Sequence, residues 1–235
     1  MAKPMTYFLY LFGFLPSILW LFFYLRKDAH PESNRMILKI FFFGMLAAFF
    51  AIFLEKGFQL ITSHPFLVIF LGGAFIEEYL KYLVVKFGVF KNSEMDEPPD
   101  LLLYMIISAL GFAALENILV LSNYHPILTP VKALEVMGWR FVSATFLHAL
   151  CSGTLGYFLA LSFFHIRQRK RFFLAGLVIV MTLHGLYNWS IMKIEGPEKF
   201  ILPFFVLIIL AWLVSFWLKK LKRLKSICLV EKFEV

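Results

Sequence analysis

The stretch at residues 65–85 reads PFLVIFLGGAFIEEYLKYLVV and decides the fold of this 235-residue chain. It is long and apolar enough to cross a bilayer as one helix, which needs about 20 mostly apolar residues. It also carries Glu77, Glu78 and Lys81. A charged side chain inside hydrocarbon is costly, usually faces the interior of a helical bundle and marks a functional site. The stretch therefore predicts a membrane span that contributes to a polar site.

The rest of the chain is equally apolar. Hydrophobic residues make up 61% of the sequence, charged residues make up 16%, and the mean hydropathy is +0.80. An ordinary soluble domain is about 45–50% apolar and about 25% charged, so a water-soluble domain is excluded. The two cysteines, Cys151 and Cys228, are too few for a disulfide framework or a thiolate metal site.

Six further apolar stretches qualify as spans, and we expect one all-helical membrane domain over residues 1–235. The seven predicted spans are 5–25, 37–54, 65–85, 101–122, 141–164, 172–192 and 200–218. Lys and Arg gather in the first, third and fifth connections and in the tail, an excess that is typical of cytoplasmic segments. The N-terminus is therefore predicted outside and the C-terminus in the cytoplasm, with residues 219–235 forming a basic tail.

The net charge of +8 follows from these basic connections. They favour anionic lipid headgroups, so the lipid bilayer is the expected partner and nucleic acid is not. The sequence leaves the oligomeric state open.

Four successive spans carry polar residues at positions that should be apolar. They are Glu77, Glu78 and Lys81 in the third span, Glu116 and Asn117 in the fourth, His148 in the fifth, and His184 and Asn188 in the sixth. With a rise of about 1.5 Å per helical residue, Glu116, His148 and His184 lie at similar depths below the outer ends of their spans. Glu77 lies nearer the midplane. We expect them to share a site in the outer half of the bilayer.

Spacing within each span adds detail. Glu77 and Lys81 are four residues apart and can form an ion pair, whereas Glu78 points about 100° away from Glu77. His184 and Asn188 also share one face, which suits them to stabilise an oxyanion or to fix the tautomer of the imidazole.

Two carboxylates, two histidines and an asparagine suit the activation of water for peptide-bond hydrolysis. The seven predicted spans contain no Asp, which argues against an aspartyl dyad, and the zinc motif HExxH is absent. Ser152 lies on the same face as His148, and we interpret it as a packing residue rather than as a nucleophile.

Four motifs occur in order on successive spans. They are Glu-Glu-x-x-Lys from Glu77, Phe-x-x-x-Glu-Asn from Phe112, the isolated His148, and His-x-x-x-Asn from His184. This pattern resembles the PrsW-type intramembrane proteases, which are related to the CAAX prenyl endopeptidases and the bacteriocin-processing membrane proteases. The resemblance covers about half of the chain, a core near residues 65–192. It implies a helical protease that cleaves membrane-associated proteins or peptides, in some bacteria an anti-sigma factor on its extracytoplasmic side.

The resemblance also implies residue roles. Glu77 would be the general base, with Glu78 and Lys81 supporting its carboxylate, and His148 would help to hold the water or a metal ion. His184 and Asn188 would stabilise the tetrahedral oxyanion.

Two positions depart from the pattern of the CAAX group. The CAAX group has an Arg one residue after the position of Lys81, and it has a His at the position of Glu116. The role of Glu116 therefore stays open. It could contact the water or a metal ion, or it could hold the second motif in place together with Asn117.

Metal dependence is also open. Glu116, His148 and His184 could form a carboxylate and imidazole site of the kind that zinc accepts, with a position left for water. The sequence has no pair of histidines at i and i+4, which favours a metal-free glutamate mechanism. The expected cofactor is therefore none or a single divalent metal ion.

Two other functions share these features. A non-catalytic scaffold of the same fold would keep the motifs for assembly alone. A proton-coupled transporter also places Glu, Lys and His within spans, although the chain lacks the clear inverted repeats that are typical of transporters.

Overall fold

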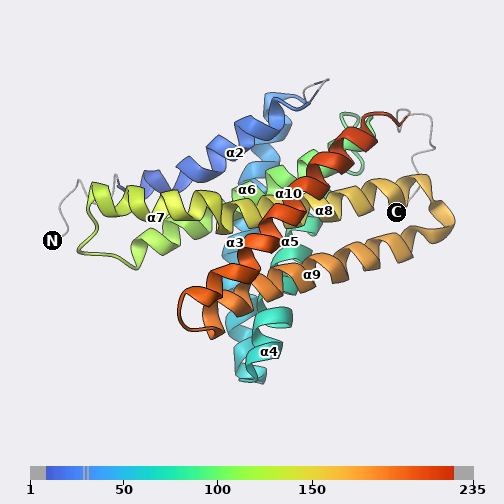
Figure 1. The fold of residues 1–235 in the computed structure, drawn as a ribbon. Coiled ribbons are helices and arrows are strands. Elements are labelled where there is room, and N and C mark those ends of the chain that lie inside the picture. The colour runs from blue at the N-terminus through green and yellow to red at the C-terminus, as the bar shows by residue number, and fades with distance from the viewer. Residues whose placement is uncertain (1–8, 29, 31, 225–235) are drawn as a thin grey trace.

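The computed structural model describes residues 9–28, 30 and 32–224, and every regular element in these residues is a helix. The elements are η1 (Tyr10–Phe14), α2 (Leu15–Leu25), α3 (Asn34–Ile61), α4 (Pro65–Leu67), η2 (Val68–Phe75), α5 (Ile76–Gly88), α6 (Pro98–Ser122), α7 (Pro130–Val142), α8 (Ala144–Phe164), η3 (Ile166–Gln168), α9 (Arg169–Lys193), η4 (Pro197–Phe200) and α10 (Ile201–Leu221). Figure 1 shows them as a single bundle.

The predicted all-helical class is confirmed. Within the described residues, five helical stretches are long and apolar enough to cross a membrane, judged by length and composition: Asn34–Ile61, Pro98–Ser122, Pro130–Phe164, Ile166–Lys193 and Pro197–Leu221. Tyr10–Leu25 is a shorter apolar helix, and residues 65–88 form three consecutive helical pieces. Residues 5–8 of the first predicted span and 225–235 of the predicted tail lie outside the described part. The span count of seven and the orientation stay predictions.

Helix starts follow capping signals in the sequence. Ser33 Oγ accepts a hydrogen bond of 3.2 Å from the backbone N–H of Met36 at the start of α3, and Thr129 does the same for Lys132 in α7. Helix α6 begins at Pro98, where a proline is tolerated because the first helical N–H has no partner within the helix.

Helix α6 lies at the centre of the bundle, packed between α3 and α8. The backbones of α3 and α6 approach most closely at two glycines. A Cβ atom at Gly44 would overlap the carbonyl oxygen of Ser108, and one at Gly111 would overlap that of Phe41. Small residues at such crossings are typical of helices packed in membranes.

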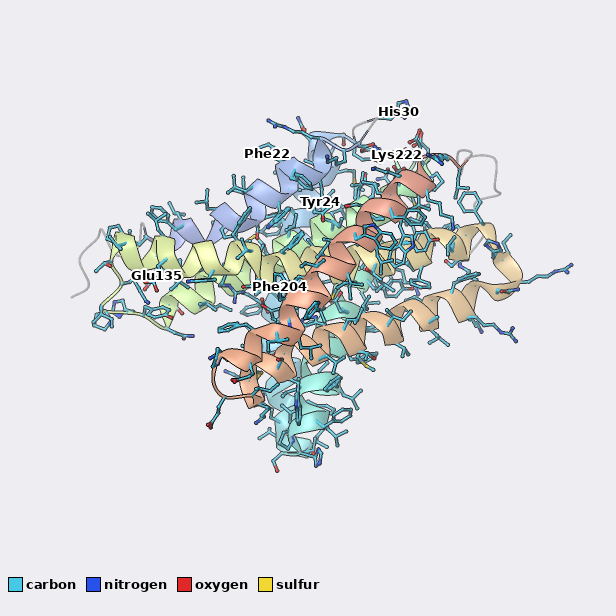
Figure 2. All side chains as sticks on the ribbon, viewed as in Figure 1. Phe22, Tyr24, His30, Glu135, Phe204 and Lys222 are labelled. Carbon is cyan, nitrogen blue, oxygen red and sulfur yellow. The ribbon has the colours of Figure 1, made fainter. Side chains whose placement is uncertain are left out.

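Helix α9 lies beside α8 after the chain reverses at η3, and α10 crosses over α8 (Figure 1). Large apolar side chains point outward from the bundle, among them Phe22 on α2 and Phe204 on α10, each 59% exposed (Figure 2). An apolar exterior of this kind is suited to lipid rather than to water.

A break at Ser143, with φ −122° and ψ −100°, separates α7 from α8. The predicted fifth span began at residue 141, but α8 begins at Ala144 and residues 141–142 end α7. The sequence analysis did not predict α7, which brings Arg140 to the polar site.

Candidate active site

The acidic pair of the third predicted span stands at the start of α5, directly after the π-helical segment η2. Glu77 and Glu78 occupy the first turn, and Lys81 follows one turn later. Their side chains are buried, with Glu77 only 7% exposed. Wide helical turns of the π type are frequent next to functional sites, and here the turn precedes the residues that the sequence singled out.

Lys81 connects the acidic pair to α8. Its Nζ lies 2.8 Å from Glu78 Oε1, 3.4 Å from Glu77 Oε2 and 2.8 Å from Nδ1 of His148, and it sits 4.3 Å from the ring centroid of Phe112. The predicted pair between Glu77 and Lys81 is confirmed. Glu78, which the helical rotation directs about 100° away from Glu77, also pairs with Lys81 and lies closer to it than Glu77 does. The i, i+3 spacing of Glu78 and Lys81 also places them on neighbouring positions of the helix surface.

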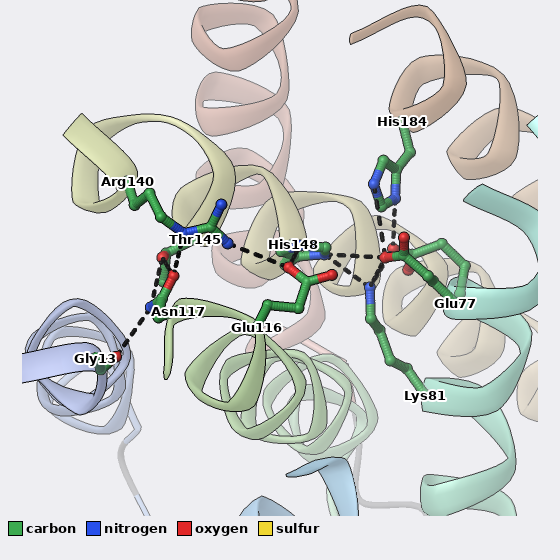
Figure 3. Close-up of polar contacts among 10 residues, drawn as sticks. Gly13, Glu77, Lys81, Glu116, Asn117, Arg140, Thr145, His148 and His184 are labelled. Carbon is green, nitrogen blue, oxygen red and sulfur yellow. Dashed lines mark hydrogen bonds and ion pairs between the residues drawn. The ribbon is translucent and has the colours of Figure 1, made fainter. Parts of the chain in front are cut away.

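The contacts of His148 define its tautomer. An ammonium group can only donate hydrogen bonds, so Nδ1 of His148 accepts from Lys81 and carries no proton. The proton of a neutral ring is then on Nε2, which donates to Glu116 Oε2 at 2.8 Å (Figure 3). The Nδ1 lone pair faces the carboxylate of Glu77, whose Oε2 lies 3.7 Å away.

His184 has the opposite tautomer. Its Nδ1 lies 3.0 Å from Glu78 Oε1, a carboxylate oxygen that can only accept, so Nδ1 is the protonated nitrogen. Its Nε2 lone pair therefore faces Glu77 Oε2, 3.8 Å away. Two imidazole lone pairs and one carboxylate oxygen converge on the same small volume (Figure 3).

Glu116 and Asn117 tie this group to the N-terminal part of the chain. Arg140 Nη2 donates to Glu116 Oε2 at 3.2 Å, and Arg140 Nε donates to Oδ1 of Asn117. Asn117 Nδ2 in turn donates to the carbonyl of Gly13 at 3.1 Å. Asn117 therefore links η1, α6 and α7. The predicted fifth span begins at residue 141, one residue after Arg140, so the sequence did not single this residue out.

Ser152 is more than a packing residue, so that interpretation was wrong. Its Oγ donates to Glu78 Oε2 at 2.7 Å, and both side chains are fully buried. Glu78 thus receives hydrogen bonds from Ser152, Lys81 and His184. Its two oxygens are fully engaged, which suits it to position its neighbours.

A cavity of about 390 Å³ opens beside Glu77. Its lining comes from α3 and from α5 to α9, and includes Glu116, Arg140, His148, His184 and the half-buried Asn188. Small residues of α3, Ala48 and Ala51, form part of the opposite wall together with Glu55, which sequence analysis also missed. A cavity of this size has room for a short peptide segment. The structure therefore brings predicted residues from each of four spans to one cavity, whereas the predicted Glu78, Lys81 and Asn117 are not part of its lining.

Comparison with known proteins gives the family. A family model described as PrsW family intramembrane metalloprotease matches residues 32–217. The chain belongs to the PrsW family. It is similar to the protein named Protease PrsW of Geobacillus kaustophilus, with 31% identity over 186 residues, 78% of this chain and 79% of the relative. The Bacillus subtilis protein of that name is 30% identical over 223 residues, 93% of this chain and 96% of the relative. No solved structure matches the chain at a significant level.

Membership of the PrsW family makes this chain a multi-pass intramembrane protease. The predicted family and enzyme class are confirmed. The family description also implies a metal ion.

The side chains fit a divalent metal ion. One ligand atom each of Glu77, His148 and His184 lies within 4.8 Å of the others, and two imidazoles with one carboxylate form a common catalytic zinc set. Each ring donates its other N–H to a carboxylate, Glu116 or Glu78, as metal-binding histidines do. The ligand set suggested by the sequence contained Glu116, but this residue contacts the opposite nitrogen of His148.

Proposed function

We propose that this PrsW-family protease hydrolyses peptide bonds of membrane-associated proteins with water activated by Glu77. The observation that carries the proposal is the convergence of three acceptor atoms beside the cavity. Glu77 Oε2 lies 3.7 Å from the unprotonated Nδ1 of His148 and 3.8 Å from the unprotonated Nε2 of His184. The ammonium group of Lys81 lies 2.8 Å from that Nδ1 and 3.4 Å from Glu77 Oε2 and offsets the repulsion between these two acceptors. Glu77 Oε2 and Nε2 of His184 are left to accept hydrogen bonds from a water.

In the proposed reaction, the water oxygen attacks the carbonyl carbon of the scissile bond while Glu77 takes the proton from the water. The C–N bond then breaks, and the proton passes from Glu77 to the departing amine. His148 orients the water. Lys81 offsets the negative charge of Glu77 and Glu78 during these steps.

The oxyanion of the tetrahedral intermediate is assigned to Asn188 and His184. Both line the cavity. The side-chain amide of Asn188 is a donor in the resting state, whereas Nε2 of His184 donates only in molecules whose ring has already taken up a second proton from solvent. Preorganised donors at such a position stabilise the developing charge without reorganisation.

Glu77, His148 and His184 would hold the metal ion that the family description implies. When bound, a divalent ion supplies Lewis-acid polarisation of a carbonyl and lowers the pKa of a bound water. Glu78 and Glu116 would hold the two imidazoles in the tautomers that leave the ligand nitrogens unprotonated, and Lys81 would have to release Nδ1 of His148, which accepts from it at 2.8 Å. With a metal bound, Nε2 of His184 would be a ligand, and Asn188 alone would be left to donate to the oxyanion.

The proposed topology is a single domain with seven spans, an external N-terminus and a cytoplasmic C-terminus. The five long apolar helices, the shorter helix Tyr10–Leu25 and the helical pieces of residues 65–88 would together make the seven spans. Glu116 lies near the end of α6, His148 near the start of α8 and His184 in the last part of α9. These ends face outward in the proposed orientation, which puts the site in the outer half of the bilayer. The substrate would be a membrane protein or membrane-associated peptide, such as an anti-sigma factor.

The experiment that tests the proposal does not require a known substrate. Cells that express the wild-type chain, Glu77→Gln or His184→Ala are compared by mass spectrometry of newly formed N-termini in their membrane proteins. We expect cleavage products with the wild type and none with either variant. The matched control is Glu135→Gln, because Glu135 is an exposed carboxylate on α7 that pairs only with Lys132 among the described residues.

Retention of the same products by both Glu77→Gln and His184→Ala would refute the catalytic assignment. A scaffold would keep its cellular effect in Glu77→Gln, and a transporter would lose flux without any peptide product. The water is activated either by Glu77 alone or with the help of a metal ion. To separate these two possibilities, the metal content and activity of the purified protein are measured before and after chelation.

A further inference from the structure

A second cavity, of about 370 Å³, lies at the opposite end of α8 and α9 from the candidate active site. It is lined by the last turns of α8, the first turns of α9 and the end of α5. Figure 1 shows α8 and α9 joined at this end of the bundle. Three cationic side chains line it, Lys86 from α5 with Arg169 and Lys170 from α9. We call it the cationic cavity.

The three cations of the cationic cavity have no acidic partner among the residues that the structure describes. Among these residues, no side-chain ion pair or hydrogen bond involves Lys86, Arg169 or Lys170, although the guanidinium of Arg169 lies 4.8 Å from the ring centroid of Phe163. Acidic residues of the neighbouring α5–α6 connection are engaged elsewhere, because Glu94 accepts two hydrogen bonds from Ser33, of 3.0 and 2.9 Å. Glu97 lies 2.7 Å from a ring nitrogen of His30. Three positive charges therefore line one cavity without an acidic partner in the described part of the chain.

The start of α9 adds to this imbalance. Arg169 and Lys170 are its first two residues, and its first turn contains no acidic side chain. The N-terminus of a helix carries a partial positive charge, so cations there are unfavourable unless an anion accompanies them. Both the side chains and the helix end thus favour a bound anion.

We propose that the cationic cavity binds the phosphate group of an anionic phospholipid. Phe90, Leu159 and Phe173 supply apolar walls beside the three cations, and they provide a surface for acyl chains that a free phosphate would not use. In the proposed orientation this end of the bundle faces the cytoplasmic leaflet. Basic pockets between membrane helices on that side are suited to anionic headgroups.

The test measures lipid binding by native mass spectrometry on the full chain in detergent, with phosphatidylglycerol as the probe and phosphatidylcholine as the neutral comparison. The variant combines Lys86→Gln, Arg169→Gln and Lys170→Gln. The matched control combines Lys91→Gln, Arg167→Gln and Arg171→Gln, which removes three exposed cations from the same end of the bundle without touching the cavity lining.

We expect the cavity variant to bind phosphatidylglycerol at least about tenfold more weakly than the wild type, while the control variant keeps the wild-type affinity. An equal loss in both variants, or no loss in either, would overturn the proposal. Competition by glycerol 3-phosphate as strong as that by the lipid would show a free-phosphate site instead. If the triple variant does not fold, Arg169→Gln is compared with Arg167→Gln by the same measurement. Since no substrate is involved, the outcome is independent of the proposed protease function.

Discussion

Oε2 of Glu116 lies 2.8 Å from Nε2 of His148 and determines which nitrogen of that ring carries the proton. Arg140 holds the same oxygen at 3.2 Å, so the carboxylate is fixed from two sides. His148 consequently directs the lone pair of Nδ1 toward Lys81 and Glu77. Glu116 is therefore a positioning residue in the proposed reaction, acting through His148 rather than on the substrate.

The substitution Glu116→Gln tests this role. An amide can donate to Nε2 and so favour the tautomer in which Nδ1 is protonated and cannot accept from Lys81. We expect kcat to fall by about 10- to 100-fold, as for other residues that orient a catalytic histidine. The effect is measured as the initial rate of cleavage of a substrate that was identified from its newly formed N-terminus. Glu135→Gln is the control. A wild-type rate in Glu116→Gln would show that Glu116 does not set the tautomer.

Ser152→Ala tests the support of Glu78. The hydroxyl of Ser152 donates to Glu78 Oε2 at 2.7 Å, and its loss leaves a fully buried carboxylate oxygen with one donor fewer. We expect the free energy of unfolding to fall by about 1–3 kcal/mol. Chemical denaturation in detergent measures it.

Ser162→Ala is the control for Ser152→Ala. Ser162 is also buried on α8, but its hydroxyl donates to the carbonyl of Leu159 within its own helix, and a smaller loss is expected. Equal losses in the two variants would mean that the contact between Ser152 and Glu78 adds nothing specific.

The sequence predicted the polar residues of the site better than it predicted their contacts. Glu77, His148 and His184 stood out because ionisable groups are rare in apolar spans, and they meet at one cavity. Ser152 is not unusual in a span, so its hydrogen bond to Glu78 depends on a helix pairing that no local pattern contains. Arg140 was missed because the predicted fifth span began one residue after it, at residue 141, although α7 carries Arg140 to Glu116.

The helical segments themselves followed from apolar length and from capping residues such as Ser33 and Thr129. The break at Ser143 was not predictable in this way, because no Pro or Gly marks it. The close crossing of α3 and α6 was also hidden, since a glycine in an apolar span is common and only the partner helix shows why Gly111 is needed.

Gly111→Ala tests that crossing. The added methyl group would overlap the carbonyl oxygen of Phe41, and backbone cannot move aside as a flexible side chain can. We expect a loss of about 1–3 kcal/mol in the free energy of unfolding. Gly138→Ala is the control, because no atom lies within 4 Å of the added methyl on exposed α7. That variant should be slightly more stable than the wild type, by about 0.4–1 kcal/mol. A neutral Gly111→Ala would contradict the close approach.

The stability of the folded protein should depend on pH through Glu32, which lies outside the spans in the connection between α2 and α3. Burial of its carboxyl group, reinforced by nearby acidic side chains, raises its pKa to about 8 despite a hydrogen bond of 2.8 Å from the hydroxyl of Tyr104. In the unfolded chain the pKa of Glu is about 4.3. Between these two values the folded state binds more protons than the unfolded state. The stability therefore falls as the pH rises from about 4.3 to about 8 and then levels off.

Glu32→Gln removes this contribution because an amide does not titrate. We expect the variant and the wild type to have similar melting temperatures in detergent near pH 5, where Glu32 is protonated in the folded protein. Near pH 9 the variant should melt at the higher temperature, since the wild type must then keep a carboxylate in a half-buried position that favours the neutral form. Glu195→Gln, at an exposed glutamate, should show no such change with pH. A difference between Glu32→Gln and the wild type that is the same at both pH values would contradict the raised pKa.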